Sequence, residues 1–347
     1  MRNFFVASIT AAMFFMSGAP KPCAQPAWSV NLVAEYQFRP FGLARHARNQ
    51  MPPSWTADQG ALFLNPDILA VFQVLESHDL PALQPRDSSG GEGKFLFQAV
   101  IFDVGAGIKL RTLQLPTTSS GASRIYPTHD GRFLVRTGDA LRLYSTEFEQ
   151  IGFKLLPHSD PVSHETAVIS VSRSGRQIFI DYNPGGVREI IDADTLEPLS
   201  VPPHPEAAAQ SGLRSFHFAA KDTSCPSGGY STAQYSVGFG CKELKVFSSD
   251  GELFWDVPMN EEVVRASVSA NTLAALIYHH RANPLDLDLA PEPLRIDLYD
   301  LPSRTVKCSI PYRHSEIRGM WPLMMFSQSS NGTIAVLQGN DLSVYPR

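Results

Sequence analysis

Apolar and polar residues alternate over short stretches along most of this chain, and turn residues separate the stretches. In Ile125–Arg136 an apolar run lies on each side of Asp130-Gly131. The same arrangement returns in Ala167–Ile180, Val264–Ile277 and Met324–Leu337. Alternation with a period of two predicts β-strands. The pairs Asp-Gly, Ser-Gly and Asn-Gly at their centres supply the positive φ that tight hairpins need. The pattern therefore predicts repeated β-hairpins.

Each hairpin is followed by a second pair of apolar runs, and this pair ends near a proline. Leu141–Thr146 leads to a run from Gln150 to Pro157, and Leu294–Asp300 leads to one from Val306 to Pro311. Proline suits a strand end because it cannot donate to a sheet ladder. The unit of four strands closes at five prolines, namely Pro116, Pro157, Pro202, Pro258 and Pro311.

A four-stranded unit has two apolar faces and buries them only by stacking on its neighbours. The repeat therefore predicts an all-β ring, a β-propeller, and six blades fit residues 58–117, 122–158, 165–203, 211–259, 263–312 and 318–347. The last unit lacks a fourth strand, and Trp28–Phe38 can supply it and close the ring. The first unit carries a polar insert, Glu76–Gly93, so seven blades remain an alternative. With 43% hydrophobic and 18% charged residues among 347, the composition excludes a disordered chain.

This pattern resembles the WD40/YVTN-like β-propeller superfamily over nearly all of residues 28–347. The Gly-His and Trp-Asp signature of WD40 repeats is missing, because Trp255-Asp256 falls on a predicted outermost strand rather than on a third strand. The resemblance implies a scaffold with a central channel and two loop-bearing faces. Such a scaffold hosts both binding proteins and enzymes.

The first 27 residues have the organisation of a secretory signal peptide and its flank. Arg2 provides a positive charge, Phe4–Met16 is apolar, and Ser17–Ala27 is rich in small residues and proline. An apolar helix of this length spans about 20 Å, short of the roughly 30 Å hydrocarbon core of a membrane. We therefore expect a secreted or periplasmic protein without a transmembrane domain in its mature form. The cleavage site stays open, and lipid anchoring at Cys23 is disfavoured by a poor lipobox.

Export permits disulfides, and it changes the interpretation of four cysteines. Cys23 is expected to be lost or to lie in the flank. Cys225 and Cys241 lie on either side of a Gly/Ser-rich turn region and are candidates for a disulfide. The alternative is that these two and Cys308 are buried thiols. The spacing lacks a CxxC motif, so no zinc site is predicted.

Two loop regions provide candidates for a ligand-binding face. The first, Arg39–Arg48, joins the closing strand to the first blade and offers Arg45, His46 and Arg48; a packed crossover is the alternative. The second follows a predicted strand and offers His279, His280 and Arg281, with solvated loop residues as the alternative. Adjacent histidines on a strand point to opposite sides and do not readily share a metal. Asp286 and Asp288 alone are too few ligands for calcium.

No catalytic residue, metal site or cofactor is predicted, since no G-x-S-x-G motif or metal-ligand spacing occurs. A net charge of −5 argues against nucleic acid as a partner. The favoured function is an exported interaction module, monomeric, whose loops bind a protein, peptide or glycan. One alternative is a lactonase-like propeller hydrolase with its active site at the channel mouth. Another is a structural part of an envelope complex.

Overall fold

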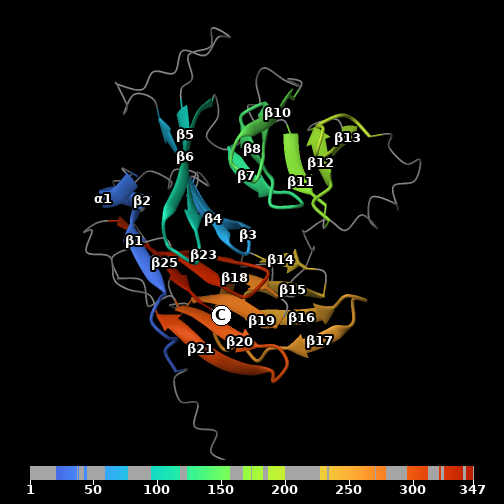
Figure 1. The fold of residues 1–347 in the computed structure, drawn as a ribbon. Coiled ribbons are helices and arrows are strands. Elements are labelled where there is room, and N and C mark those ends of the chain that lie inside the picture. Colours follow the sequence, from blue (N-terminus) through green and yellow to red (C-terminus); the bar gives the residue numbers. More distant parts are fainter. Residues whose placement is uncertain are drawn as a thin grey trace, which may run out of the picture.

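The computed structural model describes most of the chain between Lys21 and Pro346, with several segments left out. The described residues are 21–36, 38, 43–44, 59–76, 95–117, 123–156, 167–172, 174–182, 187–199, 227–232, 234–269, 271–278, 295–311, 320–321, 324–338 and 341–346. They contain one short helix and a series of small antiparallel sheets (Figure 1).

Six of these sheets follow one another along the chain as blades. Blade 1 contains β3 (Gln59–Asn65), β4 (Ile68–Glu76), β5 (Phe95–Asp103) and β6 (Lys109–Thr117). Blade 2 contains β7 (Arg124–Pro127), β8 (Phe133–Thr137), β9 (Ala140–Tyr144) and β10 (Gln150–Leu155). Blade 3 contains β11 (Ala167–Val171), β12 (Gln177–Tyr182) and β13 (Val187–Asp192), with a further bridge between Ile191 and Pro198.

The second half of the chain repeats this arrangement. Blade 4 contains β14 (Ser227–Ser231), β15 (Tyr235–Gly240), β16 (Glu243–Ser248) and β17 (Leu253–Asp256). Blade 5 contains β18 (Glu262–Val268), β19 (Thr272–Tyr278), β20 (Arg295–Asp300) and β21 (Thr305–Pro311). Blade 6 contains β23 (Met324–Gln328), β24 (Ile334–Gln338) and β25 (Asp341–Tyr345). A separate pair of short strands joins β2 (Leu43–Ala44) to β22 (Met320–Trp321).

The N-terminal strand completes the last blade, as the sequence predicts. β1 (Trp28–Asn31) pairs with β25 in an antiparallel register that places Trp28 opposite Val344. The predicted strand over residues 28–38 is too long, because α1 (Leu32–Tyr36) takes over directly after Asn31. The Asn31 side chain accepts a hydrogen bond from the Ala34 amide at 3.0 Å, which caps this helix. Closure therefore uses only four residues of strand.

The buried core lies between the blades rather than inside any one of them. One cluster joins blade 6 to blade 1, a second joins blades 1 and 2, and a third joins blades 2 and 3. Two more join blade 4 to blade 5 and blade 5 to blade 6. Residues 200–226, between β13 and β14, lie outside the described part of the chain. This stacking is the burial that a single blade cannot achieve alone.

The described part of the chain is a β-propeller of six blades, which confirms the predicted fold class. β3, β4, β5 and β6 form one continuous sheet, so the first repeat is a single blade rather than two. The predicted hairpin turns are also confirmed: Asp130 has φ of 54° and Gly175 has φ of 75°. Trp255-Asp256 lies on the outermost strand β17, as the repeat pattern predicts.

Candidate functional site

The predicted ligand-face residues Arg45, His46, Arg48, His279, His280 and Arg281 all lie outside the described residues, so these predictions remain open. Cys225 also lies outside them, and its pairing with Cys241 stays a prediction. Cys241 itself is buried and disulfide-bonded. The expectation for Cys23 is wrong: it forms a disulfide with Cys308, with their Cα atoms 4.8 Å apart. Cys23 therefore belongs to the folded domain.

The most conspicuous exposed apolar group lies on β10, the outermost strand of blade 2. Ile151 and Phe153 are each 51% exposed and Leu155 is 66% exposed, although large apolar residues are usually buried. We call these three residues the β10 ridge. Isolated exposed apolar residues need no explanation, but three on alternate positions of one edge strand form a patch typical of an interaction surface.

The opposite face of β10 is covered by blade 3. A side chain at Gly152 would lie within 3.3 Å of Leu196, so the absence of one lets the turn after β13 approach closely. Next along the strand, Lys154 Nζ lies 3.0 Å from Glu189 Oε1 on β13. Since this face is occupied by the neighbouring blade, the alternation of the strand sends the β10 ridge to solvent.

A polar group behind the covered face holds blade 3 against blade 2. The Tyr182 hydroxyl donates to Glu189 Oε2 at 2.8 Å, and burial together with this hydrogen bond raises the pKa of Tyr182. The buried Arg136 donates from Nε to the Gly138 carbonyl at 2.8 Å and from Nη1 to the Ala167 carbonyl on β11. These contacts, with the shared apolar core, give the β10 ridge a rigid support.

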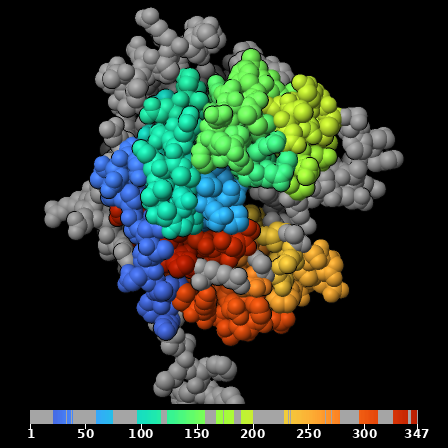
Figure 2. Space-filling view, in the orientation of Figure 1, coloured from blue at the N-terminus to red at the C-terminus, as the bar shows by residue number. Residues whose placement is uncertain are grey.

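Charged side chains of both signs lie near the β10 ridge, since Glu147 and Glu149 are in the turn before β10. The sequences of β9 and β10 contain no acidic residue, and their charged residues are Arg142 and Lys154. Arg142 lies opposite Phe153 in the sheet register, and its guanidinium carbon is 5.4 Å from the centroid of that ring. A cation over an aromatic face is favourable and fixes both groups. Figure 2 shows the exposed surface of blade 2, in bright green, between blades 1 and 3.

A second cluster joins the turns of blades 2 and 3. His129 Nδ1 donates to Asp130 Oδ2 at 2.7 Å, and this bond lowers the pKa of Asp130. His129 Nε2 lies 2.7 Å from Asp194 Oδ1 without an aligned hydrogen bond. Arg132 Nη1 also reaches Asp194 Oδ1, at 2.5 Å. The imidazole is nearly buried, at 7% side-chain exposure, so this cluster holds two blades together rather than presenting a histidine to a ligand.

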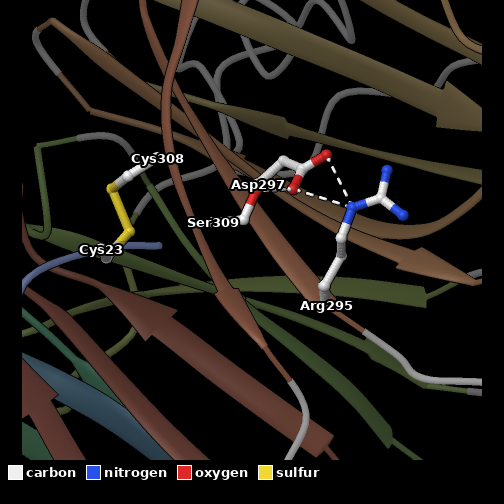
Figure 3. Close-up of a disulfide and its surroundings, with 5 residues drawn as sticks. All are labelled: Cys23, Arg295, Asp297, Cys308 and Ser309. Carbon is white, nitrogen blue, oxygen red and sulfur yellow. Dashed lines mark hydrogen bonds and ion pairs between the residues drawn. A yellow bond between two sulfur atoms is a disulfide. The ribbon is translucent and has the colours of Figure 1, made fainter. Parts of the chain in front are cut away.

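A third polar cluster lies in blade 5 beside the Cys23–Cys308 disulfide (Figure 3). Arg295 Nε donates to both carboxylate oxygens of Asp297, at 3.0 and 3.2 Å, and its Nη1 donates to Glu261 Oε1 at 2.9 Å. The Ser309 hydroxyl donates to Asp297 Oδ1. Asp297 is buried, and its charge is compensated by these donors. The cluster anchors the strand that carries Cys308.

Sequence reasoning missed the β10 ridge, the His129 cluster and the Cys23–Cys308 pairing. The alternation of Ile151, Phe153 and Leu155 predicts a strand, but it does not say which face is left uncovered. The other two groups join residues that lie far apart in the sequence, as Arg132 and Asp194 do.

Neither a metal-binding cluster nor a membrane-spanning helix occurs among the described residues. They contain no group of three or more His, Cys, Asp or Glu side chains placed to hold a metal ion. No helix among them is long and apolar enough to cross a membrane.

No family model and no curated protein matches the chain. Among solved structures, the chain is similar to the WD40 domain of Neurospora crassa Pan2, with 13% identity and a TM-score of 0.47, covering 88% of this chain and 94% of that one. It is also similar to BBS1N, solved in complex with ARL6DN, with 10% identity and a TM-score of 0.44, covering 94% and 98%. Kluyveromyces lactis Hsv2 is similar with 10% identity and a TM-score of 0.43, covering 81% of this chain and 91% of that one. Because these identities and TM-scores are low, we assign the fold from the strand order described above and infer function only from the residues of the site.

Proposed function

We propose that this chain is an exported protein-interaction module that binds an extended, acidic segment of a partner protein along β10. The observation that carries the proposal is the β10 ridge, three exposed apolar side chains on the edge strand of a rigid blade. Export is supported by the apolar segment Phe4–Met16 and by the disulfide between Cys23 and Cys308, because disulfides persist in oxidising compartments.

The form of the partner follows from the backbone of β10. Among the described strands, β10 pairs only with β9, so its outer N–H and C=O groups face away from the sheet. Edge strands of this kind are usually protected by charge or proline, and an unprotected apolar edge is a template for an added strand. Strand addition takes affinity from main-chain hydrogen bonds and specificity from alternate side chains. An extended peptide therefore fits this edge better than a helix or a flat surface.

The chemistry of the partner follows from the side chains on the two faces. Apolar residues on one face of an added strand would lie beside Phe153 and its neighbours. Residues on its other face would lie on the side of Lys154, which is paired with Glu189, and Arg142 adds a positive charge on the ridge face, over the Phe153 ring. Because β9 and β10 carry no acidic residue, a strand that alternates apolar and acidic residues complements both the shape and the charge.

A synthetic peptide of alternating valine and glutamate tests the proposal. We expect it to bind in isothermal titration calorimetry, and amide shifts in NMR spectra to concentrate on β10 and β9. Replacing Phe153→Ser should weaken binding by about tenfold or more, since an aromatic anchor dominates small interfaces. A valine–lysine peptide should bind far more weakly, because it places like charges against Lys154 and Arg142.

Leu253→Ser provides the matched control, because Leu253 is 55% exposed on the outermost strand of blade 4. This variant should bind the valine–glutamate peptide as the unchanged protein does. The same peptide methylated on alternate backbone nitrogens should lose binding if main-chain hydrogen bonds hold it. The proposal fails if Leu253→Ser weakens binding as much as Phe153→Ser, or if the methylated peptide binds equally well.

The predicted lactonase-like hydrolase and the envelope-complex role gain no supporting contact from the described residues. They stay predictions, as does the monomeric state.

A further inference from the structure

Residues 21–36 pair with the edges of blades 5 and 6 and then contact blade 1, and we call this segment the strap. It begins at blade 5, on the edge of β21. The Cys23 amide donates to the Ser309 carbonyl at 2.9 Å, and the Ser309 amide donates to the Lys21 carbonyl at 2.9 Å. Pro22 thereby forms a parallel bridge with Ser309. The disulfide joins Cys23 to Cys308 at the same place (Figure 3).

The strap continues across blade 6 as its outermost strand. The Ala27 amide donates to the Val344 carbonyl at 2.8 Å, and β1 then pairs with β25. Two side-chain contacts accompany the ladder: the hydroxyls of Ser29 and Ser343 lie 2.8 Å apart, and Asn31 Nδ2 donates to Asp341 Oδ1 at 2.9 Å.

The strap ends against blade 1. The Trp28 indole donates to the Val104 carbonyl at 2.7 Å, and its ring centroid is 5.7 Å from that of Phe102. The Tyr36 ring meets Phe102 edge-on at 5.4 Å, and Gln98 Nε2 donates to the Tyr36 carbonyl at 3.2 Å. The strap therefore connects blades 5, 6 and 1.

A terminal segment held only by non-covalent contacts frays easily. The disulfide prevents this, because it fixes the start of the strap to a strand 285 residues away in sequence. In the chain-entropy model, a cross-link over so long a loop restricts the unfolded chain strongly. The ring is thus closed twice, by strand pairing at blade 6 and by a covalent bond at blade 5.

We propose that the mature protein keeps the whole strap, with its signal segment removed before Lys21, and that oxidation of Cys23 and Cys308 locks the ring after export. This inference rests on the proposed export. Cleavage after Ala24 would remove Cys23 and leave Cys308 without its partner. The lock requires an oxidant, a protein dithiol-disulfide oxidoreductase. One cysteine thiolate attacks the disulfide of that oxidant, and the second thiolate then displaces it. The two cysteines lose two electrons and two protons, and the oxidant is released as a dithiol.

Processing can be measured on the full chain expressed in a bacterial host. Intact mass and N-terminal sequencing of the exported fraction should give a chain that starts at or before Lys21. Non-reducing peptide mapping should recover the Cys23–Cys308 pair, with neither thiol available to iodoacetamide. A mature chain that starts after Cys23 would overturn the inference. A chain that stays in the cytoplasm with Met1 would instead overturn the export proposal, while peptide mapping after oxidation in vitro would still decide whether the lock forms.

The lock itself can be measured by mutation. Cys23→Ser and Cys308→Ser should each lower Tm by roughly 3–8 °C, and the double variant should lower it no further than either one. Equal and non-additive effects are expected because both substitutions remove the same bond. Ser29→Ala is the matched control: it lies in the strap, on the exposed hydrogen bond to Ser343, and should change Tm little. Additive effects of the two cysteine substitutions, or an unchanged Tm in both, would contradict the lock.

Discussion

Trp28 and Val104 are 76 residues apart in sequence, and the indole Nε1 of Trp28 donates a hydrogen bond to the Val104 carbonyl at 2.7 Å. This bond ties the strand that completes blade 6 to the β5–β6 turn of blade 1. The indole also lies against Gly107, where an added Cβ would meet it at 2.8 Å. Trp28 thus contributes both a hydrogen bond and ring packing to the junction between the last and first blades.

Replacing Trp28→Ala should lower the free energy of unfolding by about 2–4 kcal/mol, since it removes both ring packing and a hydrogen bond. Trp28→Phe keeps an aromatic ring and loses the N–H donor, so it should cost about 1 kcal/mol. Urea unfolding followed by circular dichroism measures both. Equal losses in the two variants would contradict a separate contribution from packing.

Gly175 has φ of +75°, and a Cβ added there would lie 2.4 Å from the His129 amide nitrogen. Gly175→Ala should therefore destabilise the protein by roughly 2 kcal/mol or more, because a backbone clash adds to an unfavourable φ. Gly251 is the matched control, since its φ is +86° and its Cβ would meet nothing within 4 Å. Gly251→Ala should cost only about 1 kcal/mol. Thermal unfolding measures both losses of stability. A smaller loss for Gly175→Ala than for Gly251→Ala would mean that the backbone at His129 shifts to accept the added methyl group.

Asp297 is buried with its carboxylate on Arg295 and Ser309, and Asp297→Ala should leave the guanidinium with fewer partners. We expect a loss of about 3 kcal/mol in unfolding free energy, as for a broken buried pair. Ser309→Ala removes one donor to the same carboxylate and should cost about 1 kcal/mol. Urea unfolding compares the two losses of unfolding free energy. A larger loss for Ser309→Ala than for Asp297→Ala would mean that the ion pair does not stabilise blade 5.

Asp192, at the end of β13, accepts hydrogen bonds from the amides of Asp194 and Thr195 and from the Thr195 hydroxyl. The backbone hydrogen bond from Asp194 is the main cause that lowers the pKa of Asp192, and those from Thr195 add to it. A lowered pKa of Asp192 stabilises the folded state at any pH above the pKa of the unfolded carboxyl, about 3.9. This stabilisation disappears as the pH falls through the lower pKa of the folded state.

The variant Asp192→Asn should therefore be less stable than the unchanged protein at pH 7, and the difference should shrink as pH falls below about 4. Urea midpoints measured across this range provide the comparison. The exposed Asp256, on β17, is the control position. If the stability difference between Asp192→Asn and the unchanged protein instead grew as the pH fell, the pKa of Asp192 would not be lowered by folding.

Much of the fold could be predicted because each step rests on local sequence. Alternation in Ile125–Arg136 gives two strands, and Asp130-Gly131 gives the turn between them, with φ of 54° and 75°. The closing strand at Trp28 followed from the missing strand of the last unit. Its length did not, because Asn31 caps α1 and ends the strand at its fourth residue.

The candidate site could not be predicted, because exposure depends on which neighbour covers each face. Phe153 and Lys154 are adjacent in sequence, yet blade 3 covers only the side of β10 on which Lys154 meets Glu189. The expectation that Cys23 lay outside the domain had the same origin. Nothing near Cys23 indicates a partner 285 residues away.

By itself, the sequence determined the repeated four-strand unit, the turns and the origin of the closing strand, since hydrophobic period and turn chemistry act over a few residues. The tertiary structure decided which apolar row stays exposed, which charges meet between blades, and that Cys23 is bonded to Cys308. These relations depend on the relative placement of distant strands, and only the packing of one blade against the next fixes that placement.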